Sequence, residues 1–172
     1  MHTPEAILYR DTLPETQCLL LLPGAIKGAV DDPAEALLSE DAGLTPGAPV
    51  REIHCDGVPA AHVLAARAER LDAEAPAGVR TLERCLKEAI VLADGLGVSE
   101  LSFLALRVDT YDSRLFALMT VFFRVLMQER GKHPCLERIR FFCPQKDDAQ
   151  WIARVYNFYY PADKSERMNV PD

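Results

Sequence analysis

The side chains most able to do chemistry in this sequence are aspartates in its loops. Two short loops carry two carboxylates each, one at Asp31 and Asp32, the other at Asp109 and Asp112. If these loops meet, their oxygens are the ligands that Mg²⁺ and Ca²⁺ prefer. However, Asp32 and Asp112 each stand just before a predicted helix, where a carboxylate caps free backbone N–H groups. We therefore expect helix caps here and no metal site.

Histidine and cysteine occur close together twice, as His54-Cys55 and as His133-Pro134-Cys135. The first pair lies in an alternating stretch, so its side chains point to opposite faces of a strand. Neither pair completes the four ligands of a zinc site. The five cysteines form no CxxC pair and lie mostly in apolar settings, which is typical of reduced, buried thiols. Because no nucleophile–base signature, P-loop or dinucleotide-binding loop is present, we predict no catalytic residue and no cofactor.

Length and charge restrict the class of protein. The chain has 172 residues and a formal net charge of −7. This length suits one domain, and the negative charge disfavours binding to nucleic acid or to an anionic membrane. No apolar run reaches the roughly 20 residues that a membrane-spanning helix needs, and the start lacks the layout of a secretory signal. We expect a single cytoplasmic domain over residues 1–161, followed by a polar tail at 162–172.

Apolar periodicity predicts the elements that position these loops. Short apolar runs bounded by turn residues indicate strands, and apolar stripes that end at glycine indicate helices. The expected strands are 6–9, 17–22, 50–55, 62–67, 101–106 and 136–143, and the expected helices are 33–40, 79–96, 114–130 and one that begins at Asp147. The later strands alternate with helices, which requires crossover connections. The predicted class is α/β, a three-layer α/β/α sandwich with a mixed, largely parallel sheet.

The helix at 114–130 is apolar around nearly its whole circumference. Such a helix is buried on more than one side. It is either wedged between the sheet and a neighbouring helix, which we favour, or covered by a second subunit. The aromatic residues between Trp151 and Tyr160 are expected in the core and at its edge, and an exposed part of them would suit a protein contact.

Ligands of an open α/β sheet bind at the carboxyl ends of its strands. The residues that would line this crevice are Pro23, Gly24, Ala25, Gly28, Arg107, Asp109 and Tyr111. Tyr111 is the side chain best able to stack on a base or ribose, although packing against the following helix is an equal alternative. Asp11, in the polar turn after the first strand, is either a turn aspartate that caps Thr12 or Leu13 or a carboxylate that binds a ligand.

Five stretches, at 9–12, 18–22, 41–43, 57–63 and 100–106, together resemble the macro domain, the α/β/α module that binds ADP-ribose. Residues 9–12 stand where the family has Gly-Asp-Ile-Thr, and 18–22 resembles the buried strand that carries its Asn-rich motif. The resemblance covers the chain from about Ala6 to Tyr160. It implies the macro-domain fold, an ADP-ribose-like ligand and a contact between Asp11 and the adenine.

The sequence also departs from the family at the ligand loops. The family's Asn-Ala-Ala-Asn falls on 22–25, Leu-Pro-Gly-Ala, so both asparagines are replaced, including the one that holds the distal ribose and a water in hydrolytic members. The two phosphate loops fall on 30–33 and 107–112, where four carboxylates appear in place of glycines. Glycine lets backbone N–H groups approach a diphosphate, and negative charge beside it weakens binding. Lys27, Arg107 and Arg114 compensate in part, and the resemblance implies a degenerate site.

These observations favour a divergent, non-catalytic, macro-domain-like protein that binds a nucleotide-like ligand or a protein partner in a remodelled crevice. One alternative is a retained ADP-ribose binder or ADP-ribosyl hydrolase with altered loops. The other is an oligomeric assembly protein that uses the 114–130 helix as its interface. Only fold likeness supports ligand binding at this point, and a fold does not imply a function.

Overall fold

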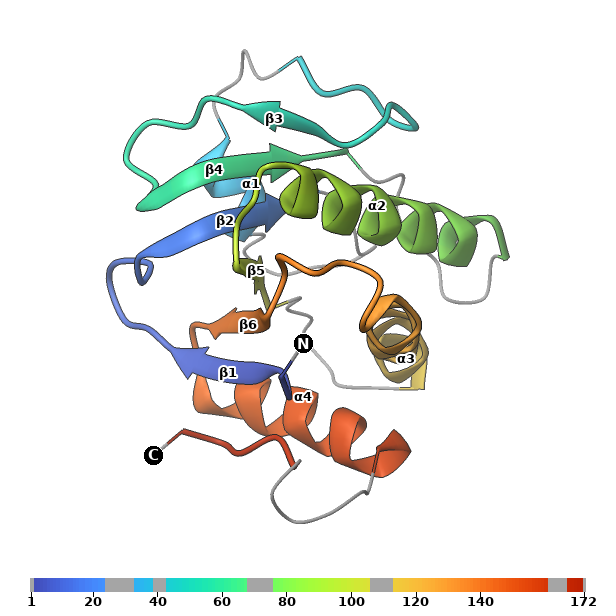
Figure 1. Cartoon of the computed structure of the whole chain (residues 1–172). Helices are drawn as coiled ribbons and strands as arrows, with labels where there is room; N and C mark the ends of the chain where they lie inside the picture. The colour runs from blue at the N-terminus through green and yellow to red at the C-terminus, as the bar shows by residue number, and fades with distance from the viewer. Residues whose placement is uncertain are drawn as a thin grey trace.

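The computed structural model of the chain describes residues 2–23, 33–38, 43–67, 76–105, 113–160 and 167–171. Figure 1 shows the arrangement of the elements. The strands are β1 (Glu5–Leu8), β2 (Thr16–Leu21), β3 (Arg51–Ile53), β4 (Ala60–Ala65), β5 (Glu100–Leu104) and β6 (Arg138–Cys143). The helices are α1 (Pro33–Leu37), α2 (Pro76–Gly95), α3 (Ser113–Glu129) and α4 (Lys146–Tyr159). Each element predicted from apolar periodicity is therefore present.

The strands form one sheet in the order β1-β6-β5-β2-β4-β3. Every neighbouring pair is parallel except β3 and β4, which are antiparallel. At the centre, Leu20 of β2 lies between Leu64 of β4 and Phe103 of β5. Neighbours such as β2 and β5 are far apart in the sequence, so the chain must cross over between them. The predicted mixed, largely parallel sheet is confirmed.

Side chains alternate between the two faces of the sheet, as the pleat of a strand requires. In β2, Cys18 and Leu20 belong to one apolar cluster, and Leu19 and Leu21 belong to another. Helices α2, α3 and α4 contribute to the first cluster, and α1 contributes to the second. Figure 1 shows α2 on one side of the sheet and α1 on the other. The three-layer α/β/α arrangement is confirmed.

Helix α3 is buried by the chain itself. Phe122 and Phe123 are 2 % and 0 % exposed, and the rings of Phe141 in β6 and Tyr156 in α4 pack against Phe123. Arg124, the next residue along the helix, is exposed. The apolar circumference of this helix is thus explained by packing within one subunit, between the sheet and a neighbouring helix.

The connection of residues 9–15, here named the strap, joins the end of β1 to the start of β2 without a helix (Figure 1). Because β6 and β5 lie between these two strands, the strap must pass across both of them. Tyr9 and Leu13 pack with the second apolar cluster, which puts the strap on the face that α1 covers in part. The strap's position matters because it carries Asp11.

Part of the expected polar tail, residues 167–171, lies against the fold. Met168 is buried, and its backbone N–H and C=O both hydrogen-bond to the Asn157 side chain, at 3.0 and 3.1 Å. Residues 161–166 lie outside the described residues. In the described part of the chain, every helix is too short or too polar to cross a bilayer.

Candidate functional site

The structure describes two of the predicted site residues, Asp11 and Pro23. Pro23 follows β2 directly and is buried. The others lie outside the described residues, namely Gly24, Ala25, Gly28, Arg107, Asp109 and Tyr111, and so do Asp31, Asp32 and Asp112. The geometry of the site therefore has to be built from Asp11 and its surroundings.

Asp11 lines a surface cavity of about 510 Å³ between the strap and α1. One wall comes from the strap, a second from Pro33, Ala36 and Leu37 of α1, and a third from the turn before β4. The full lining is Tyr9, Asp11, Thr12, Leu13, Pro33, Ala36, Leu37, Gly57 and Pro59. Pro23 is not part of this lining, so the structure does not bring the two described site residues into one cavity.

The Asp11 carboxylate is exposed and makes no hydrogen bond or ion pair in the part of the chain that the structure describes. The capping of Thr12 or Leu13 considered from the sequence is therefore not formed. Leu13, Pro33, Leu37 and Pro59 give the cavity mostly apolar walls. An unpaired carboxylate beside apolar walls suits a flat ligand that carries an N–H donor, because the carboxylate accepts hydrogen bonds only.

Two contacts fix α1 against the strands and so hold the second wall in place. The Arg67 guanidinium donates to both carboxylate oxygens of Glu35, at 3.2 and 3.0 Å, in a bidentate pair. The Cys55 thiol donates to the Leu37 carbonyl oxygen at 3.0 Å. Helix α1 is only five residues long, so these contacts supply rigidity that the helix lacks alone.

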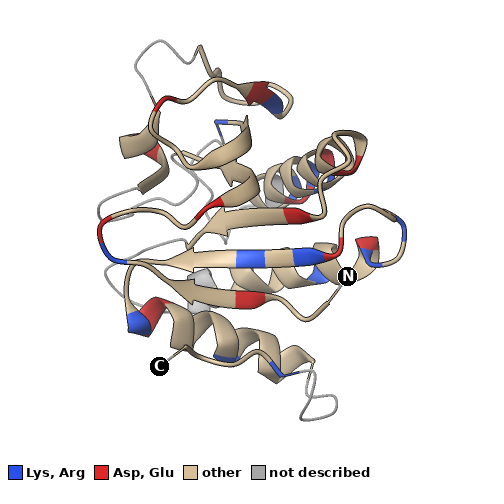
Figure 2. Cartoon of the chain, turned by 60° about the vertical axis from the view of Figure 1, so that its left-hand side comes forward, with Lys and Arg blue, Asp and Glu red and all other residues tan. Residues whose placement is uncertain are grey.

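Beneath the strap, the sheet carries a group of polar residues centred on Glu100, a carboxylate that is 7 % exposed. It accepts hydrogen bonds from Thr16 Oγ1 at 2.8 Å, from Arg140 Nη1 at 2.8 Å and from Arg138 Nη1 at 3.4 Å. In the register of the sheet, Arg140 of β6 pairs with Glu5 of β1, and Arg138 of β6 pairs with Glu100 of β5. Figure 2 shows basic segments on one strand with acidic segments on the strands beside it. Burial raises the pKa of Glu100, but the hydrogen bonds from Thr16 and Arg140 and the two arginine charges outweigh it and lower the pKa.

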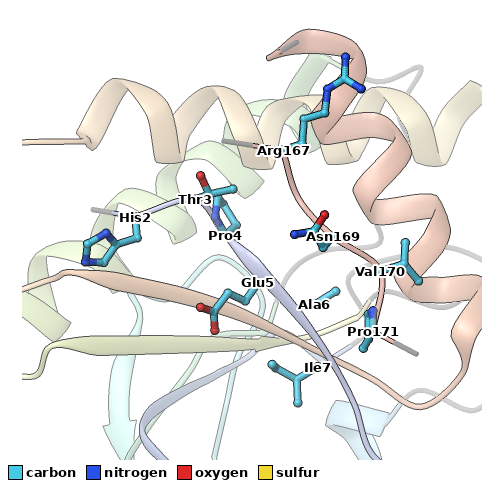
Figure 3. Close-up of a pocket in the computed structure, with 10 residues that line it drawn as sticks. All are labelled: His2, Thr3, Pro4, Glu5, Ala6, Ile7, Arg167, Asn169, Val170 and Pro171. Carbon is cyan, nitrogen blue, oxygen red and sulfur yellow. The ribbon is translucent and has the colours of Figure 1, made fainter. Parts of the chain in front are cut away.

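A second cavity, of about 550 Å³, lies between β1 and the segment 167–171 (Figure 3). Its polar lining residues include His2, Glu5, Arg167 and Asn169. In Figure 3 the side chains of Glu5 and Arg167 point in different directions. The cavity therefore does not gather its charged groups around a common point.

The histidines considered for metal chemistry bond to carboxylates, and three of the thiols are buried. His54 bonds to Asp56 and His133 to Glu129, at 2.8 and 2.9 Å. Among the described residues, no three His, Cys, Asp or Glu side chains are grouped to hold a metal ion. Burial raises the pKa of Cys18 and of Cys143 to about 12, so neither is a thiolate at neutral pH.

Leu13, Pro33, Leu37 and Pro59 were not singled out as site residues from the sequence. In the sequence, each of them is typical of a packing or turn residue. They come from the strap, from α1 and from the turn before β4, and the strand order brings these three segments together. The sequence does indicate the place of Pro33 in the chain, because proline is favoured at the first position of a helix and α1 begins at Pro33.

Solved structures provide the comparison that the sequence does not. No protein-family model matches the sequence, and no curated protein matches it significantly. The chain is similar to the Oceanobacillus iheyensis macrodomain with MES bound, with a TM-score of 0.68, 13 % identity and coverage of 92 % of each chain. The macro domain of ganglioside induced differentiation associated protein 2 gives a TM-score of 0.65 at 12 % identity, over 92 % of this chain and 86 % of that one.

A Trypanosoma brucei macrodomain in complex with ADP-ribose gives a TM-score of 0.53 at 17 % identity, over 86 % of this chain and 67 % of that one. At such identities the likeness concerns the path of the backbone. It agrees with the strand order, the parallel sheet and the helix layers described above. The chain therefore has a macro-domain-like fold.

Proposed function

We propose that this protein binds an ADP-ribose-like nucleotide and seats the base in the cavity that Asp11 lines. The observation that carries the proposal is the unpaired, exposed Asp11 carboxylate at an otherwise mostly apolar cavity. In the resemblance to the macro domain, Asp11 matches the aspartate that contacts the adenine. The macrodomains of Trypanosoma brucei and Oceanobacillus iheyensis that share the fold have been solved with ADP-ribose and with ADP.

The chemistry of the cavity supports a base rather than a phosphate. A carboxylate repels a phosphate group but accepts a hydrogen bond from the exocyclic amine of adenine. The apolar residues Leu13, Pro33 and Leu37 offer surface against which a flat ring can be buried. The positions that match the family's phosphate loops lie outside the described residues, so the proposal rests on the base end of the ligand.

We further propose that the protein does not hydrolyse its ligand. The family's paired asparagines match Leu22, which is buried, and Ala25, which lies outside the described residues. Neither side chain can hold a water or a ribose hydroxyl by a hydrogen bond. Incubation with ADP-ribosylated peptide tests this part, because steady release of ADP-ribose would show a hydrolase.

The five unpaired thiols favour a reducing, cytoplasmic location.

A second candidate function is contact with a protein partner through aromatic residues at the end of α4. Phe158 and Tyr159 are 68 % and 43 % exposed, and both rings pack against Phe116 of α3. Exposed aromatic side chains are enriched in protein interfaces. Helix α3 itself turns its other described aromatic side chains into the core, so assembly would involve this aromatic group rather than the 114–130 helix as a whole.

Titration calorimetry of two matched variants tests the base site. Asp11→Ala removes the carboxylate, and Glu137→Ala removes the same charge from an exposed side chain that does not line the cavity. Hydrogen bonds that involve a charged group contribute about 1.5–3 kcal/mol, so Asp11→Ala is expected to weaken ADP-ribose binding by roughly 10- to 100-fold. Glu137→Ala is expected to bind as the wild type does. Equal affinities for both variants would contradict the assignment of Asp11.

A further inference from the structure

The interior of the strap is held by a single hydrogen bond within the described residues. Arg140 Nη1 donates to the Glu15 carbonyl oxygen at 3.1 Å, and no other hydrogen bond reaches residues 10–15. The two ends are fixed by backbone bonds, from Tyr9 N–H to the Cys143 carbonyl at 3.1 Å and from Thr16 N–H to the Pro59 carbonyl at 3.0 Å. Between these ends, Asp11 lies on a stretch held by the packing of Leu13, by the partial burial of Pro14 and by the Arg140 contact.

The Arg140 side chain is held in place by several contacts of its own. Its Nη1 also donates to Glu100 Oε1 at 2.8 Å, and its guanidinium lies 5.0 Å from the centre of the Phe142 ring. Its side chain is only 15 % exposed. Glu100 is held in turn by Thr16, whose hydroxyl lies 2.7 Å from that of Ser102. A buried carboxylate is costly unless it is paired and hydrogen-bonded, as this one is.

Arg138 provides an internal comparison on the same strand. It reaches the same carboxylate, Glu100 Oε2 at 3.4 Å, yet its side chain is 54 % exposed and its bonds do not include the strap. Both arginines therefore neutralise Glu100. Only Arg140 connects the sheet to the connection that carries Asp11.

We propose that Arg140, oriented by Glu100, is a positioning residue that clamps the strap and so sets where the Asp11 carboxylate stands in the cavity. This inference rests on the proposed nucleotide binding for its effect on affinity. The clamp itself is a property of the ligand-free protein. Glu15 is four residues from Asp11, close enough along the chain for its anchorage to restrict the whole turn. The clamp holds the strap as one wall of the cavity, opposite the wall that α1 supplies.

The test compares Arg140→Met with Arg138→Met. Both variants keep an unbranched apolar stem and remove one arginine that pairs with Glu100, but only the first removes the strap contact. The first readout, called strap exchange below, is amide hydrogen exchange in the ligand-free proteins at Tyr9 and Thr16, whose hydrogen-bonded N–H groups bound the strap. It is taken relative to exchange at Leu101 and Phe103 in the centre of the sheet. The second is the affinity for ADP-ribose, measured alone and together with Asp11→Ala.

We expect Arg140→Met to speed strap exchange by roughly 10- to 100-fold, the factor that corresponds to one hydrogen bond from a charged donor. Strap exchange in Arg138→Met stays at the wild-type rate. ADP-ribose affinity falls in Arg140→Met, and most of this loss disappears when Asp11 is already alanine, because the clamp acts through that carboxylate. Arg140→Lys, whose ammonium can donate to both acceptors, restores most of the affinity. A residue that serves stability alone would not give this coupling.

Equal strap exchange in the two methionine variants would overturn the clamp. Faster strap exchange with unchanged affinity, in a protein that binds ADP-ribose, would overturn the positioning role. If the wild type does not bind ADP-ribose, the proposed function fails, and the exchange comparison still decides whether Arg140 clamps the strap. Should Arg140→Met fail to fold, Arg140→Gln, which keeps a polar end, takes its place in both measurements.

Discussion

Replacing Phe123 by alanine measures whether α3 is core or interface. Phe123 is fully buried, and its ring centre lies 5.7 Å from that of Phe141 and 5.1 Å from that of Tyr156. Removing a buried phenylalanine ring costs about 3–5 kcal/mol, from lost burial and from the cavity that remains. Single domains are stable by only about 5–15 kcal/mol, so Phe123→Ala should remove a large fraction of the stability.

Urea denaturation followed by circular dichroism gives the size of this effect. With a slope of about 2 kcal/mol per molar urea, the midpoint should fall by roughly 1.5–2.5 M. Phe158→Ala is the matched control, because it removes the same ring from a position that is 68 % exposed. Its expected effect is within about 1 kcal/mol, since surface substitutions cost little. Light scattering on the same samples gives their size in solution.

The reasoning would be refuted by a Phe123→Ala protein that keeps its midpoint and changes its size in solution. That result would mean that the ring is covered by a second subunit. A large loss of stability without a change in size would show that the chain alone buries α3. The control guards against a general effect of removing aromatic rings.

Three further predictions concern the rest of the fold. The pKa of Glu100 is lowered in the folded state, so the ionised carboxylate stabilises the fold above the ordinary pKa of a glutamate. This contribution is lost as the pH falls through the lowered pKa. Glu100→Gln should therefore reduce the loss of stability that acid-unfolding curves show below about pH 4.5. A thiol reagent at neutral pH should label the exposed Cys135 first and should reach Cys18 and Cys143 only on unfolding, which peptide mass mapping can check; early labelling of Cys18 would contradict its burial. Asn157→Leu removes both hydrogen bonds to Met168 and should expose the segment 167–171 to proteolysis, whereas an unchanged digestion pattern would show that apolar packing holds it.

The elements were readable from the sequence because their signals are local. The run from Cys18 to Leu22 is apolar at every position and gives β2, which is buried on both faces. The stripe from Leu82 to Ala93 gives α2, and Gly97, at a φ of 72°, stands just past its end. The apolar spacing of a helix or a strand, and a glycine that ends a helix, can each be recognised from a few neighbouring residues.

The site was harder to predict because it depends on the strand order. Asp11 could be placed in a polar turn, but nothing local shows that this turn crosses β6 and β5 to reach β2. The burial of Glu100 likewise depends on Thr16 and Arg140, which are 84 and 40 residues away. Arg140 itself reads as the outward position of a strand with one solvated face, and its contact with the strap follows only from the crossing.

Titration of the wild-type protein with ADP-ribose, with light scattering on the same sample, tests the central claim most directly. The proposed function predicts saturable binding of one ligand per chain at the cavity that Asp11 lines, with a dissociation constant in the micromolar range. A folded protein that gives no binding heat with millimolar ADP-ribose would contradict the claim. A clean dimer in that sample would move the search to protein partners of Phe158 and Tyr159.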